Sequence, residues 1–185
     1  PCYVTIPFRM KLLTLKFIII FIYLISSSSS YAIQTPNLKN LVIHKEPKKL
    51  EKINFKNINY ETINLNKFQN SLIIINFWAT WCAPCIEEMP SLNRLQANPK
   101  FENLYVIPIN VGKDNIEKSN NFYKKLKINN LKLYFDKDID LPKKFLLRGL
   151  PTTVFINKKG EEFARVIGFV NFDDKRIIKW LQQYD

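Results

Sequence analysis

A largely apolar run, from Leu72 to Trp78, leads almost directly into a C-x-x-C pair formed by Cys82 and Cys85. A short run of this kind is typical of a strand buried on both faces, so we expect a central strand in a mostly parallel sheet. After Cys82 the apolar residues recur at helical spacing, as at Met89 and Leu92. The cysteine pair is therefore predicted to lie where a buried strand ends and a helix begins.

The cysteine count limits what this pair can be. The chain has three cysteines and one histidine, His44, and Cys2 lies upstream of Met10, a plausible true start. A tetrahedral zinc site needs four ligands, which Cys82, Cys85 and a distant histidine do not supply. A structural disulfide between them would close a tiny loop and gain little chain entropy. We therefore predict a redox-active pair that forms the Cys82–Cys85 disulfide, with no metal and no cofactor.

The predicted helix start assigns a role to each thiol. Unpaired backbone N–H groups and the positive end of the helix dipole favour thiolate over thiol. Cys82 is nearer to the helix start and is expected to be more exposed, so it is predicted to be the nucleophile. Cys85, one turn into the helix, is predicted to resolve the mixed disulfide. Pro84 fits the first turn because no helical hydrogen bond is lost there.

Composition and charge indicate a globular protein without a nucleic-acid partner. Of the 185 residues, 46% are hydrophobic and 24% are charged, which excludes a disordered chain. The formal net charge is +12, but the lysines are spread along the whole chain and no known nucleic-acid module is present. The charge is interpreted as a solvated surface that could steer acidic partner proteins.

The N-terminal segment is predicted to lie outside the folded domain. Residues 1–9 are interpreted as an upstream extension or a start-site artefact. Residues 10–32 have the basic, apolar and small-residue regions of a secretory signal, with an uncleaved membrane anchor as the alternative. Residues 33–50 are interpreted as a linker or a peripheral strand. Export would place the domain, residues 51–185, in the periplasm, where the only membrane contact would be an uncleaved N-terminal segment.

The remaining sequence alternates between strand and helix patterns. Pro108, inside a strand expected over 104–111, is awkward for a central ladder and predicts a strand end or a bulge. The other expected elements are a hairpin over 52–55 and 62–65, a helix over 115–127, a strand over 131–135, a short helix over 142–147, a hairpin over 152–156 and 162–168, and a closing helix over 173–183.

Two motifs make the chain resemble the thioredoxin superfamily. The first, Asn76-Phe77-Trp78-Ala79-Thr80-Trp81-Cys82-x-Pro84-Cys85-x-x-Glu88-x-Pro90, is similar to the active site of the TlpA/ResA branch. The second is Gly149-Leu150-Pro151-Thr152-Thr153, whose proline is cis in this family and faces the cysteine pair. The resemblance covers about 51–185. It implies an α/β thioredoxin-like fold, with a central mixed β-sheet flanked by helices, an N-terminal β-hairpin and a helix-plus-strand insertion at about 115–135.

Three positions depart from neighbouring branches of the superfamily. Asn76 stands where minimal thioredoxins carry a buried Asp, so another group must relay a proton if a relay is needed. Ala83 provides no acid between the cysteines, where ResA-like proteins can carry one. Thr152 replaces the Glu that usually follows the cis-proline in the CcmG type. Together these residues place the chain nearer to TlpA and ResA.

The resemblance implies an exported thiol-disulfide oxidoreductase that reduces protein disulfides. Its substrates would belong to cytochrome c biogenesis or would be copper-site cysteines, and a membrane protein of the DsbD/CcdA type would donate electrons. Support at the active site is expected from Trp81, Pro84, Glu88, Leu150 and Pro151, and the backbone of Leu150 would bind an extended substrate segment. Glu88 would perturb the pKa of the cysteines or relay protons. The alternative is that it stabilises the first helical turn.

Other interpretations stay open or are disfavoured. A disulfide-introducing oxidase would use the same pair, and two thiolates can hold Cu(I) in a chaperone module. A peroxiredoxin is disfavoured because the pattern P-x-x-x-T-x-x-C is absent. His44 is expected at the surface without a role. Asp136, Asp138 and Asp140 are expected in a solvated loop, because the Gly and Glu that complete an EF-hand loop are missing.

Overall fold

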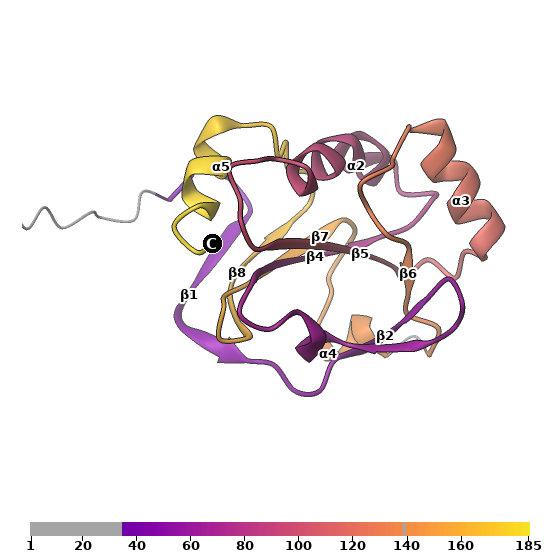
Figure 1. The fold of residues 1–185 in the computed structure, drawn as a ribbon, viewed down its shortest axis with the longest axis horizontal. Helices are drawn as coiled ribbons and strands as arrows, with labels where there is room; N and C mark the ends of the chain where they lie inside the picture. The colour runs from indigo at the N-terminus through magenta and orange to yellow at the C-terminus, as the bar shows by residue number, and fades with distance from the viewer. Residues whose placement is uncertain (1–34, 139) are drawn as a thin grey trace, which may run out of the picture. The chain divides into compact units, whose positions relative to one another are not determined.

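The computed structural model describes residues 35–138 and 140–185, which contain one mixed sheet of eight strands (Figure 1). The extension predicted over 1–9 and the signal or anchor predicted over 10–32 lie outside the described residues. The strand order across the sheet is β1-β8-β7-β4-β5-β6-β2-β3. The strands are β1 (Leu41–Lys49), β2 (Asn54–Asn57), β3 (Thr62–Asn64), β4 (Leu72–Trp78), β5 (Leu104–Asn110), β6 (Tyr134–Phe135), β7 (Thr152–Ile156) and β8 (Glu161–Ile167).

Helices cover both faces of this sheet. In Figure 1, α2, α3 and α5 lie on one side of the sheet and α4 lies on the other. The α-helices are α2 (Ala83–Gln96), α3 (Ile116–Lys125), α4 (Leu141–Lys144) and α5 (Lys175–Leu181), and a 3-10 turn, η1, spans Leu65–Phe68.

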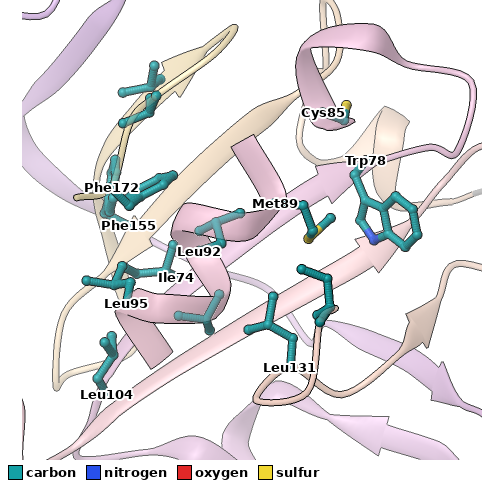
Figure 2. Packing of buried hydrophobic residues seen from close by; sticks show 14 of the residues in the cluster. Ile74, Trp78, Cys85, Met89, Leu92, Leu95, Leu104, Leu131, Phe155 and Phe172 are labelled. Carbon is teal, nitrogen blue, oxygen red and sulfur yellow. The ribbon is translucent and has the colours of Figure 1, made fainter. Parts of the chain in front are cut away.

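The pleat of β4 divides the core into two layers. Ile74 and Trp78 belong to the cluster that includes residues of α2, α3 and α5, whereas Ile73 and Phe77 belong to the cluster that includes α4. Successive side chains of a strand point to opposite faces, so one strand contributes to both layers. Figure 2 shows the first layer, in which Met89 of α2 lies between its helix and the sheet. All seven residues of β4 are buried, as the apolar run predicted.

The neighbours of β4 make the sheet mixed. β4 runs parallel to β5 and antiparallel to β7, and every other pairing except β5 with β6 is antiparallel. The expectation of a mostly parallel sheet is therefore wrong, and the central mixed sheet is confirmed. The N-terminal hairpin (β2–β3) and the helix-plus-strand insertion (α3–β6) are confirmed too, although β6 is only two residues long.

The prediction of a strand end or a bulge at Pro108 is wrong, because β5 continues through this residue. The β4–β5 register continues through the pair Asn76–Pro108 without a bulge. On the other side, β5 pairs with β6 only from Ile109 onward. Pro108 therefore lies just before the β5–β6 pairing begins, so its missing N–H removes no hydrogen bond between these two strands.

The segment over 33–50 contains a strand. β1 pairs antiparallel with β8 at one edge of the sheet, with an irregular stretch between Ile43 and Lys48. Of the two interpretations of this segment, the peripheral strand is therefore the one that residues 41–49 form, and the sheet begins before residue 51. None of the helices in the described part of the chain has the length and apolar character needed to cross a membrane.

Candidate active site at the start of helix α2

The cysteine pair lies at the predicted junction between strand and helix. β4 ends at Trp78, Cys82 is the N-cap residue of α2, and Pro84 stands within the first two helical positions. The carbonyl oxygen of Cys82 accepts hydrogen bonds from the N–H groups of Cys85 and Ile86, at 3.0 and 3.2 Å. The two sulfur atoms form a disulfide, with the Cα atoms 5.3 Å apart. Cys82 is 5% exposed and Cys85 1%, so the cysteine at the N-cap is the more accessible of the two.

The second motif reaches the same end of the sheet. The peptide bond between Leu150 and Pro151 is cis, and Thr152, the first residue of β7, pairs with Phe77 near the end of β4. Because β7 runs antiparallel to β4, the start of β7 and the end of β4 share one edge. Pro151 therefore lies at the sheet end from which Cys82 emerges. Trp81 contributes an exposed indole to this rim and is 65% exposed.

Glu88 is a buried carboxyl group rather than a first-turn residue. The first turn of α2 contains no acidic residue, and Glu88 is 0% exposed, so the interpretation of Glu88 as a helix-dipole partner is wrong. Its Oε1 accepts a hydrogen bond from Asn76 Nδ2 at 2.6 Å, and its Oε2 accepts one from the Val170 N–H at 2.7 Å. Burial raises the pKa of Glu88 to about 8, although both hydrogen bonds act to lower it.

Glu88 lies on the same helix as the cysteine pair. It follows Cys85 by three residues in the same helix, so both side chains lie on one helical face, and both are buried. Asn76, which replaces the buried Asp of minimal thioredoxins, also donates to Thr153 Oγ1 at 3.0 Å. The ionisable group that Asn76 itself lacks is therefore supplied by its hydrogen-bond partner. With a pKa near 8, this group exchanges a proton close to neutral pH.

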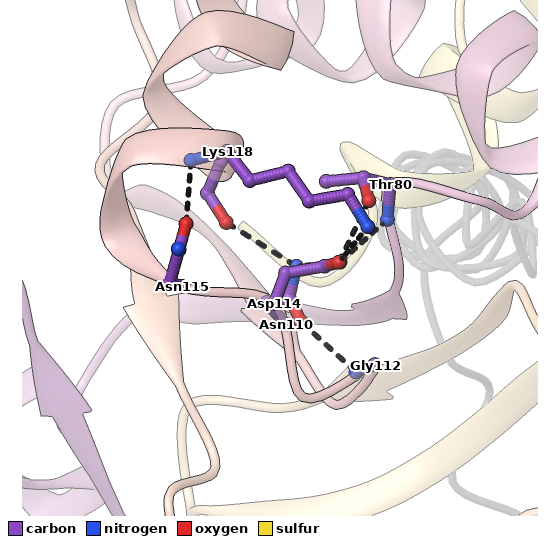
Figure 3. A network of polar contacts seen from close by, with 7 residues as sticks. Thr80, Asn110, Gly112, Asp114, Asn115 and Lys118 are labelled. Carbon is purple, nitrogen blue, oxygen red and sulfur yellow. Dashed lines mark hydrogen bonds and ion pairs between the residues drawn. The ribbon is translucent and has the colours of Figure 1, made fainter.

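A carboxylate from the next loop holds the segment before Cys82. Asp114 accepts hydrogen bonds from the Thr80 N–H (2.9 Å), Thr80 Oγ1 (2.8 Å) and Asn110 Nδ2 (3.0 Å), and it pairs with Lys118 Nζ at 2.6 Å (Figure 3). Burial acts to raise the pKa of Asp114, but these hydrogen bonds outweigh it and hold the pKa below its usual value. The sequence predicted no role for Asp114, because nothing in its own segment points to a partner as distant as Thr80.

A glycine lets the same loop approach the active-site segment. A Cβ atom at Gly112 would clash with Ala79 Cβ and would lie 3.0 Å from Trp81 Nε1, an unusually tight contact. The Gly112 N–H donates to Asn110 Oδ1 at 2.9 Å, which fixes the turn after β5. The loop between β5 and α3 therefore packs directly against the residues that precede Cys82.

Comparison with known proteins assigns this architecture to a family. Residues 47–161, more than half of the chain, match the model of the AhpC/TSA family. The chain belongs to the AhpC/TSA family. The matched range includes the hairpin, Cys82, Cys85 and the cis Pro151.

Several curated relatives of this AhpC/TSA-family chain are named thiol-disulfide oxidoreductases. It is 30% identical over 110 residues to the thiol-disulfide oxidoreductase ResA of Bacillus subtilis, which covers 60% of each chain. The chain spans 56 to 60% of the length of the first curated relatives that it matches.

Solved structures share the fold. The exposed lipoprotein thioredoxin Etrx1 of Streptococcus pneumoniae has a TM-score of 0.61 at 23% identity, covering 72% of this chain and 99% of that one. A thiol:disulfide interchange protein of Chlorobium tepidum has a TM-score of 0.62 at 19% identity, covering 75% and 99%. The predicted thioredoxin-like fold is therefore confirmed.

Two weaker candidates differ from expectation. The prediction of a surface position for His44 is wrong, because its side chain is 9% exposed and its Nε2 lies 2.7 Å from Glu162 Oε1. Asp136 is buried rather than solvated and accepts hydrogen bonds from the N–H groups of Asp140 and Leu141, at the start of α4. Within residues 35–138 and 140–185, no three His, Cys, Asp or Glu side chains come together as a metal site would require.

Proposed function

We propose that this chain is a thiol-disulfide oxidoreductase that reduces protein disulfides through Cys82 and Cys85. The observation that carries the proposal is the cysteine pair itself, which forms a disulfide at the N-terminus of α2, at the same sheet end as the cis Pro151. A thiol at a helix N-terminus is favoured as thiolate, and thiolate is the attacking species. The names of the ResA relatives support the same chemistry.

In the proposed reaction the Cys82 thiolate attacks one sulfur of the substrate disulfide. A mixed disulfide forms, and the other substrate sulfur leaves as a thiolate that takes up a proton. Cys85, deprotonated in turn, attacks Cys82 Sγ and releases the second substrate thiol. The substrate gains two electrons and two protons, and the protein is left with the Cys82–Cys85 disulfide. The greater exposure of Cys82 supports its role as the nucleophile.

Glu88 and the cis-proline segment would assist these steps. Glu88, with a pKa near 8, would take the proton from Cys85 as it becomes the attacking group. Leu150, just before Pro151, would offer its backbone to an extended segment of the substrate, as in strand addition. Such recognition depends on main-chain hydrogen bonds and therefore tolerates many substrate sequences. Trp81 and Pro84 would form the rim of the substrate contact.

The proposal extends to the cellular setting. With an export signal over 10–32, the domain would work in the periplasm, free or tethered to the inner membrane. An oxidising compartment would not keep Cys82 and Cys85 reduced, so a membrane donor of the DsbD/CcdA type would return the electrons. Disulfides of cytochrome c biogenesis and copper-site cysteines are the proposed substrates. The exposed lipoprotein among the structural neighbours supports an extracytoplasmic setting.

The reduction potential of the Cys82–Cys85 pair tests the direction of the reaction. The purified protein is equilibrated with glutathione or dithiothreitol buffers, and the oxidised fraction is measured. A potential well below about −200 mV supports a reductase. A potential near −120 mV, about that of a strong disulfide oxidant, would reverse the direction and contradict the proposal.

Trapping with serine variants tests the roles of the two thiols. Cys85→Ser should accumulate a mixed disulfide between Cys82 and the substrate, because the thiol that attacks Cys82 Sγ is missing. Cys82→Ser lacks the nucleophile and should accumulate no mixed disulfide at residue 82. If Cys85→Ser traps nothing, the assigned roles are wrong.

A further inference from the structure

A cleft lies beside the active-site segment, at the C-terminal ends of β5 and β6. It has a volume of about 340 Å³, and its lining includes Tyr60, Lys113, Asp114, Asn115, Asp136 and Lys137. We refer to it as the β5–α3 cleft. Tyr60 comes from the β2–β3 hairpin, and Asn115 is the N-cap residue of α3, so three separate parts of the chain meet at the cleft.

Two short connections join this cleft to the residues before Cys82. Asp114, in its wall, accepts hydrogen bonds from both the backbone and the hydroxyl group of Thr80. Gly112, the residue before Lys113, approaches Ala79 and Trp81 so closely that a side chain would not fit. The wall of the β5–α3 cleft is therefore bonded to, and packed against, the segment that leads to Cys82.

The groups left free in the cleft are hydrogen-bond donors and cations. The Asp114 carboxylate is occupied by Thr80, Asn110 and Lys118, and the Asp136 carboxylate accepts two backbone N–H groups. In the part of the chain that the structure describes, Lys113 and Lys137 form no ion pair. Lys137 Nζ instead lies 4.3 Å from the centre of the Tyr60 ring.

The start of α3 adds to this positive character. The Asn115 side-chain oxygen accepts from the Lys118 N–H, which leaves its NH₂ group as a donor. The positive end of the α3 dipole lies at the same place. The lining holds two aspartates as well as two lysines, but both carboxylates are engaged within the protein, so the groups that remain available favour a ligand with acceptors and negative charge.

We propose that the β5–α3 cleft is a subsite for an acidic segment of the protein substrate, held there while Cys82 attacks the substrate's disulfide. The proposal rests on the proposed function and names the class of substrate for that same site. Asp or Glu side chains of the substrate pair with Lys113 and Lys137 and hydrogen-bond to Asn115. The excess of basic side chains spread along the chain steers the same class of substrate toward the protein.

Matched disulfide peptides test the subsite. Two peptides contain the same disulfide and differ only in a pair of residues about four positions, or about 13 Å of extended chain, from the cysteine. One peptide carries Glu-Glu there and the other Gln-Gln. The kcat/KM of each peptide is measured with the reduced protein, and the ratio between the two peptides is compared among variants. This ratio cancels any general loss of activity in a variant.

The expected ratio is about five in favour of the acidic peptide, which corresponds to about 1 kcal/mol, and it should fall as salt is added. In Lys113→Gln/Lys137→Gln the ratio should fall to about one, mainly through KM. Lys100→Gln/Lys179→Gln removes the same charge from exposed positions outside the cleft and should keep the wild-type ratio.

A neutral small disulfide, hydroxyethyl disulfide, separates the two proposals. If the wild-type protein reduces it but shows no preference for the acidic peptide, or if the cleft variant keeps the preference, the subsite is overturned and the proposed function stands. A preference lost equally in both double variants would also overturn the subsite, because net charge alone would then account for it. If neither peptide nor hydroxyethyl disulfide is reduced, the proposed function itself fails, and the subsite fails with it.

Discussion

The two most deeply buried glutamates of the molecule stand in opposite electrostatic settings. Glu88 lies on α2 behind the cysteine pair and is 0% exposed, and Glu162 lies on β8 near the outer strand and is 1% exposed. Glu88 receives hydrogen bonds only from an amide side chain and a backbone N–H, which carry no charge. Glu162 is paired with Arg165 at 2.6 Å and with His44 at 2.7 Å.

The pKa values of the two groups follow from their partners. Burial acts to raise both values. For Glu88 nothing charged offsets it, and the pKa rises to about 8. For Glu162 the hydrogen bonds and charges of Arg165 and His44 outweigh burial, and its pKa is held below the usual value. The active-site end therefore keeps a carboxyl group that exchanges its proton near neutral pH, while the β1–β8 edge uses an equally buried carboxylate as a permanent charge that joins two strands.

The largest expected effect comes from Glu88→Gln. In the folded protein the pKa of Glu88 is above its unfolded value of 4.5, so the folded state holds a proton that the unfolded state releases. This contribution to stability is fully present below pH 4.5 and is lost as pH rises to about 8, at about 1.4 kcal/mol per pH unit. The upper bound over the whole window is about 5 kcal/mol. Glu88→Gln should remove this slope, measured by urea unfolding at several pH values.

The neighbouring Glu87 provides the control. It is exposed, and Glu87→Gln changes the net charge by the same amount, so it should leave the slope of the wild-type protein intact. If Glu88→Gln retains the wild-type pH dependence between pH 4.5 and 8, the contrast between the two buried glutamates is wrong.

Arg165→Met tests the other buried glutamate, Glu162, by removing its charged partner. Arg165 donates to both Glu162 oxygens and to the Phe145 carbonyl. Its loss leaves a buried carboxylate with too little compensation, so the free energy of unfolding at neutral pH should fall by about 3 to 5 kcal/mol. The pKa of Glu162 is lower in the folded protein than in the unfolded chain. The stability that the ionised carboxylate contributes is therefore present above the pKa of the unfolded chain, and it is lost as the pH falls through the pKa of the folded protein. The cost of Arg165→Met should therefore shrink in acid.

The exposed pair Arg94–Asp173 makes a matched control for that experiment. Both of its side chains are largely solvated, and Arg94→Met should cost no more than about 1 kcal/mol. A cost of Arg165→Met no greater than that of Arg94→Met would mean that burial does not distinguish the two pairs.

Asp114 provides a third case. It lies near the cysteine pair, as Glu88 does, but its carboxylate is stabilised by hydrogen bonds and a cation, as that of Glu162 is. Asp114→Ala leaves the Thr80 N–H and hydroxyl without their acceptor, and we expect a loss of about 1 to 3 kcal/mol in the free energy of unfolding at neutral pH. The pKa of Asp114 is lowered, so the difference from wild type should vanish in acid, the reverse of the trend at Glu88. Urea unfolding at pH 7 and in acid measures both, with Asp173→Ala as the exposed control. Equal costs for the two alanine variants would contradict the prediction.

Local patterns in the sequence were sufficient for the cysteine pair and its surroundings. The apolar run to Trp78 and the helical spacing after Cys82 each depend on neighbours in sequence, and both elements form as expected. The helix over 115–127 and the closing helix were predictable for the same reason, since Asn115 and Asp174 cap their first turns. The resemblance at Pro151 likewise concerned a short continuous motif, and the peptide bond is cis.

Interactions between distant segments could not be predicted in this way. The bond from Val170 to Glu88 and the pair His44–Glu162 join residues 82 and 118 positions apart. The spacing of apolar and polar residues along the sequence does not indicate which hydrogen-bond donor will face a buried carboxyl group. The sequence therefore indicated where Glu88 lies in the motif but left its environment open, and it offered no reason to expect His44 inside the molecule.

The sequence by itself determined the position of the cysteine pair between strand and helix, because this follows from residue type and spacing along one stretch of chain. The class of fold was implied by the resemblance of two short motifs to a known superfamily. The tertiary structure alone decided which carboxyl groups carry charge. It buried Glu88 against uncharged donors, Glu162 against an arginine and a histidine, and Asp114 against Thr80 and Lys118. The charge of a buried group depends on the partners that folding brings to it, and those partners come from distant parts of the chain.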